Sequence, residues 1–403
     1  MRRKVIVAGL VGLSIVAVTA GVGITADQGA GAGEIKVGNT AAYSGPVSAY
    51  AGIYRTIGAY LKMINDQGGI NGHKLVFISY DDGYTPPRTV EMTRRLVERD
   101  HVLLDFAPQG TPTSIAVREY LNRSKVPQLF VATGWSGWGD PRHYPWTMGW
   151  QPSYAIEAAA YAQYVRRHVA HPKVAILYQN DSYGRDFLEG FKKELGPDAA
   201  KIIVKEQTYE VTDATIDSQV VNLRDSGANV FFDVTAPKFT SQAIRKAYSL
   251  GWHPVHLLNS VSASVTAVLK PAGLEASKGV ISAAYLKDPG NPQLKDDSGT
   301  LRYLAFMKKN EPQADAYDPN NVYGYTIVQT LVYVLKRAGK DLSAEAIMKQ
   351  AAHIDNLRLD MLLPGVAIHT SPTDFYPLHQ VRLAQFDGAR WQLVPGVFGA
   401  TTR

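Results

Sequence analysis

The sequence predicts an α/β protein made of two doubly wound lobes, each with a mainly parallel sheet. From residue 35 onward, short apolar segments alternate with longer amphipathic ones, a rhythm typical of βαβ units. The rhythm stops over residues 134–152, which hold three prolines, four glycines and four tryptophans, and then resumes. At 403 residues the chain also exceeds the roughly 250–300 residues beyond which single cores stop growing. Two similar lobes are therefore expected.

The first series covers residues 35–132. Ile53, Ile57, Leu61 and Ile64 recur at a spacing of three to four, which fits one helix face, and the glycines within residues 66–72 end that helix. Strands are expected at residues 35–40, 75–80, 102–106 and 128–132, and further helices at residues 89–99 and 113–123.

The second series repeats this alternation after residue 152. Helices are expected at residues 154–167, 187–195, 216–224 and 239–250, and strands at residues 174–178, 202–204, 230–234 and 256–258. Beyond these, the pattern predicts a surface loop at residues 288–297, a helix at residues 320–338, and a hairpin of residues 380–386 and 391–394 around Asp387-Gly388.

The first residues differ from the rest. Three basic residues after Met1 precede an apolar stretch over residues 5–24 and then small residues, the pattern of a secretory signal peptide. We expect residues 1–26 to be such a signal; an uncleaved membrane anchor is the alternative. Because the chain has no cysteine, we expect neither disulfides nor a lipid-modified cysteine. The expected location is the periplasm.

The charge pattern argues against nucleic acid as a partner. The formal net charge is +6, and loss of Arg2, Arg3 and Lys4 with the signal would leave +3. The remaining lysines and arginines are dispersed among acids, whereas nucleic-acid binding usually shows a concentrated basic patch.

Catalytic patterns do not assemble in this sequence. The glycines of residues 29–33 precede the first expected strand, whereas a dinucleotide-binding pattern must follow it. Residues 134–137 resemble a nucleophile elbow but lack its spacing. His168 and His171 lie three residues apart, but Pro172 breaks the helix that would place them on one face. A metal site at these histidines is therefore disfavoured. We expect no enzyme activity, no cofactor and no metal.

Binding residues are expected in the loops that follow the strands. In open α/β sheets ligands bind beyond the carboxyl ends of the strands. The loop of residues 108–114 also opens a helix, whose N-terminal N–H groups favour an anion such as a carboxylate. Each serine or threonine of these loops, and Asp233 as well, could instead cap a helix. The candidates in these loops are Ser44, Tyr50, Gly110, Thr111, Ala132, Thr133 and Trp135 in the first lobe and Tyr183, Asp233, Thr235 and Ser260 in the second.

Several motifs resemble the type I periplasmic binding proteins of the leucine/isoleucine/valine-binding group, which feed ABC importers. The resemblance is carried by Ser44-Gly45-Pro46 with Tyr50, by Gly68-Gly69-Ile70-Asn71-Gly72, by Tyr80-Asp81-Asp82 and by Asn180-Asp181-Ser182-Tyr183-Gly184. It implies two lobes joined by three hinge crossings that close on a ligand. We expect residues 34–149 with 283–358 in the first lobe and residues 150–282 with 359–403 in the second.

The resemblance also implies ligand contacts. They fall near Tyr50, Gly110, Thr111, Ala132, Thr133, Tyr183 and Thr235, with Thr133 and residues 110–111 at the carboxylate-holding positions. Amino-acid binders of this group place an acid where this chain has Ser260, with Asp233 as a possible substitute, which argues against an α-amino acid. The tryptophans at residues 135, 138, 146 and 150 would either contact an aromatic acid or pack the hinge.

These observations predict an extracytoplasmic solute-binding protein. We expect it to capture a small organic solute, either of the branched-chain amino-acid type or an aromatic or other organic acid, and to deliver it as a monomer to the permease subunits of an ABC importer. A ligand-sensing module for a receptor or regulator is the alternative.

Overall fold

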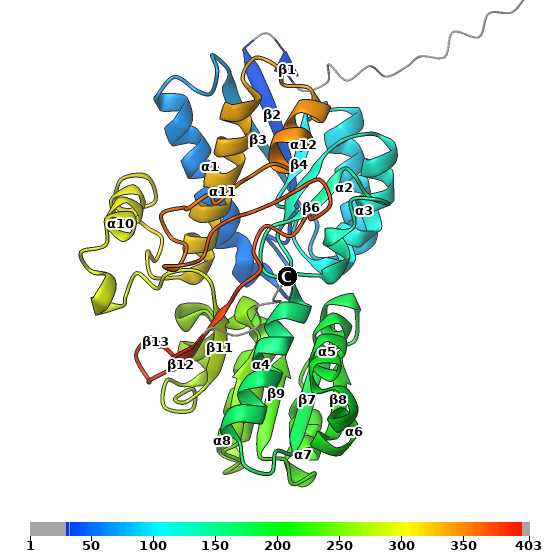
Figure 1. Cartoon of the computed structure of the whole chain (residues 1–403), viewed down its shortest axis with the longest axis vertical. Helices are drawn as coiled ribbons and strands as arrows, with labels where there is room; N and C mark the ends of the chain where they lie inside the picture. The colour runs from blue at the N-terminus through cyan, green and yellow to red at the C-terminus, as the bar shows by residue number, and fades with distance from the viewer. Residues whose placement is uncertain (1–29, 32, 397–403) are drawn as a thin grey trace, which may run out of the picture.

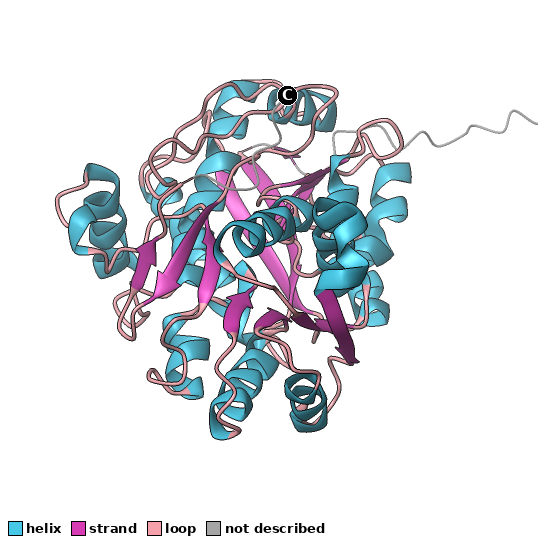
Figure 2. Cartoon of the chain, turned by 60° about the horizontal axis from the view of Figure 1, so that its bottom comes forward, coloured by secondary structure: helices cyan, strands magenta, loops and turns pink. Residues whose placement is uncertain are grey.

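Two lobes stack along the long axis of the molecule, and each has a sheet between helices (Figures 1 and 2). The computed structural model describes residues 30, 31 and 33–396, so the expected signal peptide lies outside the described residues. Within the described chain, no helix combines the length and apolar character needed to cross a bilayer. The predicted fold class is confirmed: two parallel-rich sheets, with the chain crossing three times between lobes.

The first lobe is built on a six-stranded sheet of the described residues. β2 (Glu34–Ala41) lies between β3 (Lys74–Asp81) and β4 (Leu104–Phe106), followed by β5 (Gln128–Val131) and β6 (Thr147–Gly149), all parallel; the short β1 (Ala30–Gly31) pairs antiparallel with β2. The helices are α1 (Ala51–Asp66), α2 (Pro86–Glu98), α3 (Thr111–Arg123), α10 (Ser298–Asn310), α11 (Pro319–Ala338) and α12 (Ala344–Ala351). Long-range packing of α1 on α11 brings the late helices back to this lobe (Figure 1).

The second lobe is built on a seven-stranded sheet of the described residues, in the order β13-β12-β11-β10-β9-β7-β8. Its strands are β7 (Val174–Gln179), β8 (Ile203–Tyr209), β9 (Val230–Val234), β10 (Val255–Leu258), β11 (Ile281–Ala284), β12 (Arg382–Phe386) and β13 (Trp391–Leu393). β12 and β13 are antiparallel, as the predicted hairpin requires. The helices are α4 (Tyr154–His168), α5 (Ser182–Leu195), α6 (Ala199–Ile202), α7 (Asp217–Asp225), α8 (Pro237–Ser249) and α9 (Lys270–Ala272).

Local chemistry fixes where several helices begin and end. The Ser153 hydroxyl accepts the N–H of Ile156 at the start of α4, and the Asp181 carboxylate accepts the N–H groups of Tyr183 and Gly184 at the start of α5. Such caps satisfy N–H groups that have no partner within the helix. α2 and α3 begin before the predicted residues 89 and 113, because prolines in their first turns are compatible with helix initiation.

Two sequence expectations differ from the structure in instructive ways. The prediction of a surface loop at residues 288–297 is wrong for the first half of this segment, because Asn291 is buried and Asp288 lines the cavity between the lobes. Residues 354–378, most of which the expected division assigned to the second lobe, pack with the core of the first, as Met361, Ile368 and Leu378 show. We therefore propose that the last crossing lies near residue 380. The other domain boundaries stay predictions.

Candidate functional site: a cleft between the lobes

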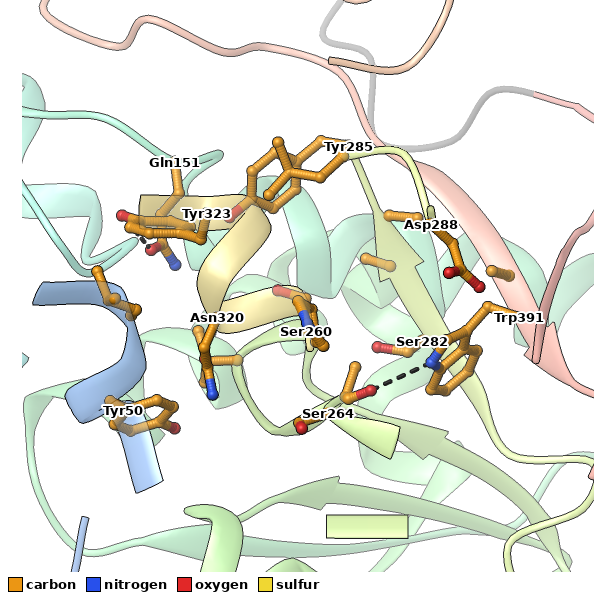
Figure 3. A pocket seen from close by; sticks show the side chains of 18 of the residues that line it. Tyr50, Gln151, Ser260, Ser264, Ser282, Tyr285, Asp288, Asn320, Tyr323 and Trp391 are labelled. Atoms are coloured by element: carbon orange, nitrogen blue, oxygen red, sulfur yellow. Dashed lines mark hydrogen bonds between the residues drawn. The ribbon is translucent and has the colours of Figure 1, made fainter. Parts of the chain in front are cut away.

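A cavity of about 380 Å³ lies between the two lobes. Its lining comes from strands of the second sheet, from strand-end loops of both lobes and from the segments that cross between lobes. Figure 3 shows Tyr50 and Gln151 on one side of this space, Ser260 and Asn320 near its middle, and Asp288 and Trp391 on the other side. Ligand sites in proteins are usually concave, largely apolar and of this size range.

One wall carries a chain of three hydroxyl groups, two from loops of the first lobe and one from the start of α4 in the second. The Thr111 and Thr133 hydroxyl oxygens are 2.5 Å apart, and the Thr133 oxygen is 3.0 Å from the Tyr154 hydroxyl. Thr111 is the first residue of the 13-residue helix α3, so free N–H groups and the positive end of the helix dipole lie at the same place. The Gln109 side chain is buried, with its Nε2 group unpaired among the described residues. The wall therefore offers donors suited to an anionic oxygen.

Glycine is required at residue 110, which lies between these donors and the ring of Tyr84. Its φ of +90° lies in the region that side chains rarely adopt. An added Cβ would also lie 2.4 Å from the ring of Tyr84. The close approach brings Tyr84 beside Gly110 in the cavity wall.

The second-lobe wall rests on a buried carboxylate. Glu157 accepts the Ser260 N–H at 2.6 Å, the Ser260 hydroxyl at 2.7 Å and the Tyr161 hydroxyl at 2.8 Å. Burial raises the pKa of Glu157 to about 7, although these donors act in the opposite direction. Ser260 lines the cavity, and Glu157 lies behind it. Glu157 therefore positions Ser260 and the turn of Ser260–Ser262.

Tyrosine rings dominate the rest of the wall near the strand ends. Tyr154 stacks on Phe187 and meets Tyr183 edge to face at 5.3 Å. Burial raises the pKa of the tyrosine hydroxyls at residues 50, 84, 154, 183, 285 and 323, so these groups stay neutral. Neutral aromatic walls favour an apolar or aromatic body in the ligand.

The far side of the cavity is formed by the β12–β13 hairpin and the segment after β11. The Trp391 indole N–H donates to the Ala263 carbonyl at 3.1 Å, which anchors the ring over the cavity (Figure 3). Arg382 and Asp288 also line this side. Among the described residues, no group of three or more histidine, aspartate or glutamate side chains is arranged to hold a metal ion.

The structure brings seven of the eleven predicted site residues to the cavity: Tyr50, Gly110, Thr111, Ala132, Thr133, Tyr183 and Ser260. The other four lie elsewhere. Ser44 is exposed and donates its hydroxyl to Asp81 at 2.6 Å. Trp135 packs edge to face on Trp138 and under Arg118. Asp233 and Thr235 are completely buried and bond to each other. Their roles as ligand contacts stay predictions.

The tryptophans of residues 134–152 serve packing. Trp138 and Trp150 are among the largest completely buried side chains, and the Trp150 indole donates to Thr330 of α11 at 2.9 Å. None of the four tryptophans in this segment is part of the cavity wall. Of the two interpretations left open by the sequence, the structure favours packing beside the crossing.

Sequence reasoning missed several residues of the wall. Tyr84, Gln151, Tyr285 and Tyr323 lie there, as do Asp288, Arg382 and Trp391. Gln109 belongs to the loop of residues 108–114, whose position after a strand already predicts a place beside Gly110 in the wall. Tyr84 lies in the loop after β3, so the rule of strand ends could have found it as well. The others reach the cleft only through the crossings or through the pairing of β11 with β12, for which a single sequence carries no signal.

Comparison with known proteins agrees with this architecture. Residues 34–390 match a family model described as "Periplasmic binding protein". The leucine-specific-binding protein of Salmonella typhimurium is 25% identical over 209 residues, covering 50% of this chain and 52% of that protein, so the match spans about half of this relative.

Solved structures of the same architecture cover more of the chain. A possible leucine/isoleucine/valine-binding protein from Rhodopirellula baltica superposes with a TM-score of 0.80 at 20% identity, covering 90% of this chain and 96% of the other. A branched-chain amino acid ABC transporter structure from Thermus thermophilus with bound valine gives 0.81 at 17% identity, covering 91% and 97%. The likeness confirms the fold, and the family match over nearly all described residues shows that this chain belongs to the periplasmic binding protein family.

Proposed function

We propose that this protein captures a small organic acid with an apolar or aromatic body and delivers it to an ABC importer. The observation that carries the proposal is the cavity walled by both lobes, with hydroxyl and helix N-terminal donors on one wall and Ser260 and Tyr183 on the other. The donors would hold a carboxylate, and the tyrosine rings would cover the body of the ligand.

Closure of the lobes is the proposed mechanical step. A ligand that touches both walls stabilises the closed form only by its greater affinity for that form. Contacts between the lobes support a closed arrangement here: the Ser136 N–H and hydroxyl donate to Asp186 of α5, and the Thr266 hydroxyl donates to Asp315. Membrane subunits would then recognise the closed protein, and the proposed role is binding rather than catalysis.

The charges of the wall support an organic acid over an α-amino acid. Glu157, the carboxylate near Ser260, already accepts three hydrogen bonds and lies behind the wall. Among the described residues of the cavity wall, Asp288 is the one acid, and it lies on the side away from Tyr50 (Figure 3). A ligand ammonium group next to a carboxylate bound at Thr133 would therefore lack a nearby counter-charge.

Export to the periplasm and a monomeric state belong to the same proposal. The family match and the names of the relatives support the first; the sequence-based signal peptide would provide the route. Neighbouring permease and ATPase genes would support import.

Titration calorimetry of ligand-free, refolded protein tests this function. The panel holds phenylacetate and 4-methylpentanoate, their uncharged amides, and leucine and phenylalanine. We expect the acids to bind at least about tenfold more tightly than the amides, because a charged oxygen gains more from oriented donors. If none of the panel binds, or if the amino acids bind best, the proposed ligand class is wrong.

A further inference from the structure

One face of the β11–β12 pair forms the floor of the cleft's far side. In the register of this antiparallel pair, Ser282 lies opposite Ala384 and Ala284 opposite Arg382. Residues two apart on a strand share a face, so all four side chains point to the same side of the sheet. All four line the cavity. Three of them are small, which leaves room over the strands, and the fourth is a guanidinium at the end of the row.

Arg382 has unused hydrogen-bonding capacity. Its Nε is buried and has no partner among the described residues, and its only described hydrogen bond runs from Nη2 to the Val394 carbonyl at 3.5 Å. No ion pair joins it to an acid within the described chain. A guanidinium with free donors is suited to two-point binding of a carboxylate.

The other charges on this side are already engaged. Lys287 donates to Asp297 at 2.6 Å and to the Asp360 carbonyl at 2.8 Å. The Asp288 carboxylate accepts the N–H of Gly290 at 2.8 Å, and burial raises the pKa of Asp288. The Arg390 side chain lies 3.7 Å from Asp387. Among the described residues of this wall, Arg382 is thus the cation without an ion-pair partner.

Resting on the proposed function, we propose that the cleft has a second anion subsite at Arg382, so that its ligand is an elongated acid with a carboxylate at each end. One carboxylate lies at Thr111 and Thr133, the apolar body crosses over Ser282, Ala284 and Ala384, and the other carboxylate reaches Arg382. Thr111 and Thr133 belong to strand-end loops of the first lobe and Arg382 to β12 of the second, so the two anchors come from opposite lobes.

Calorimetry with α,ω-dicarboxylates tests the proposal. The series runs from succinate to sebacate, each compared with the monocarboxylate of equal carbon number. We expect wild-type protein to prefer the longer dicarboxylates over the matched monocarboxylates by about tenfold or more, and succinate to show no such preference because it cannot span the cavity.

Variants locate the second subsite. Arg382→Gln should abolish the preference for long dicarboxylates over the matched monocarboxylates, while Arg390→Gln, in the same hairpin, should keep that preference. Ala384→Leu should fill the floor and weaken the long ligands more than the short ones. Thermal melts of each variant establish that it is folded.

Three outcomes would overturn the proposal, and they separate it from the broader function. If monocarboxylates bind but long dicarboxylates gain nothing, or if Arg382→Gln leaves their preference intact, the second subsite is wrong and the acid-binding function stands. If α-amino acids bind and Asp288→Asn removes that binding, Arg382 and Asp288 recognise a zwitterion instead. If no acid binds to the wild type, the subsite and the proposed function fail together.

Discussion

The loops after β5 and β9 each follow a parallel strand of their lobe's sheet, yet their polar side chains face different surroundings. After β5, the Thr133 hydroxyl lies in the cavity wall and bonds to groups that line it. After β9, the Thr235 hydroxyl bonds to Asp233 and lies 2.7 Å from the Thr240 hydroxyl, completely buried. A polar residue beyond a strand therefore indicates either a ligand contact or an internal network, and its position in the sequence does not distinguish them.

The difference comes from what covers each loop. Asn259, at the end of β10, donates its side-chain amide to the carbonyls of Asp233 and Thr235, and the Ser262 hydroxyl donates to the Thr235 carbonyl. These bonds close the β9 loop beneath the turn of Ser260–Ser262. The turn then presents Ser260 to the cavity in place of Asp233 or Thr235.

Asp233→Ala tests the internal network of the second lobe and has the largest expected effect on the free energy of unfolding. Asp233 is completely buried between the Thr235 hydroxyl and His256 Nε2, which is 3.1 Å away. Removing one partner of a buried charged network leaves the others unsatisfied, so we expect the free energy of unfolding to fall by about 3 kcal/mol. Urea denaturation measures this loss.

Asp233→Asn serves as the matched control, because it keeps the shape of the side chain and should lose less stability. Calorimetry on the folded fraction of both variants should give ligand affinity close to that of the wild type. An affinity loss of more than about tenfold with stability unchanged would mean that Asp233 contacts the ligand, as the sequence suggested.

Glu157→Gln should alter how stability depends on pH. The pKa of Glu157 rises from 4.5 to about 7 in the folded protein because of burial. A raised pKa means that, as the pH rises, the folded state keeps the proton to a higher pH than the unfolded state does. The stabilising contribution of protonated Glu157 to the free energy of unfolding is therefore fully present below pH 4.5 and is lost as the pH rises to about 7. The whole change amounts to about 3 kcal/mol.

Urea denaturation at several pH values between 4 and 8 measures this slope. We expect the decline across that window to be smaller in Glu157→Gln than in the wild type, whereas Glu91→Gln, at an exposed position of α2, should keep the wild-type slope. Identical slopes in all three proteins would show that Glu157 does not bind its proton as proposed.

Thr133→Val tests whether the polar group after β5 contacts the ligand. The substitution preserves shape and removes the hydroxyl that lies between Thr111 and Tyr154. We expect the affinity for a bound acid to fall about tenfold, and the free energy of unfolding to fall by about 1 kcal/mol. Calorimetry and urea denaturation give the two values. Thr240→Val, in the internal network of the second lobe, is the control and should reduce stability without a comparable loss of affinity.

The predictable part of the molecule follows from local periodicity. Ile53, Ile57 and Leu61 mark the buried face of α1 because helix geometry repeats every 3.6 residues, and Gly110 and Thr111 were found because strand ends of a parallel sheet share one edge. Arg382 and Trp391 could not be found in this way. They reach the cleft only after the chain crosses back and β12 pairs with β11, about a hundred residues earlier in the sequence.

Ser44→Ala has the smallest expected effect on the free energy of unfolding, and it tests whether Ser44 contacts the ligand. Ser44 belongs to the loop that leads to Tyr50, but its hydroxyl points to Asp81, which also accepts the N–H groups of Tyr43 and Gly83. Burial opposes ionisation of Asp81, yet these hydrogen bonds together keep the pKa of its carboxyl below the usual value. Loss of one partly exposed hydrogen bond should cost about 0.5 kcal/mol in urea denaturation.

Affinity decides what Ser44 does. If the residue only braces the loop, the dissociation constant of Ser44→Ala should stay within about twofold of the wild-type value, and Ser48→Ala, a partly exposed serine of the same loop that precedes Tyr50, should behave alike. A tenfold loss confined to Ser44→Ala would mean that the loop turns its hydroxyl toward the ligand on binding. In that case the Ser44 hydroxyl would bond to the Asp81 carboxylate without ligand and to the ligand after binding. The first lobe would then differ from the second even in this loop, because the polar side chains after β9 bond, among the described residues, only within their internal network.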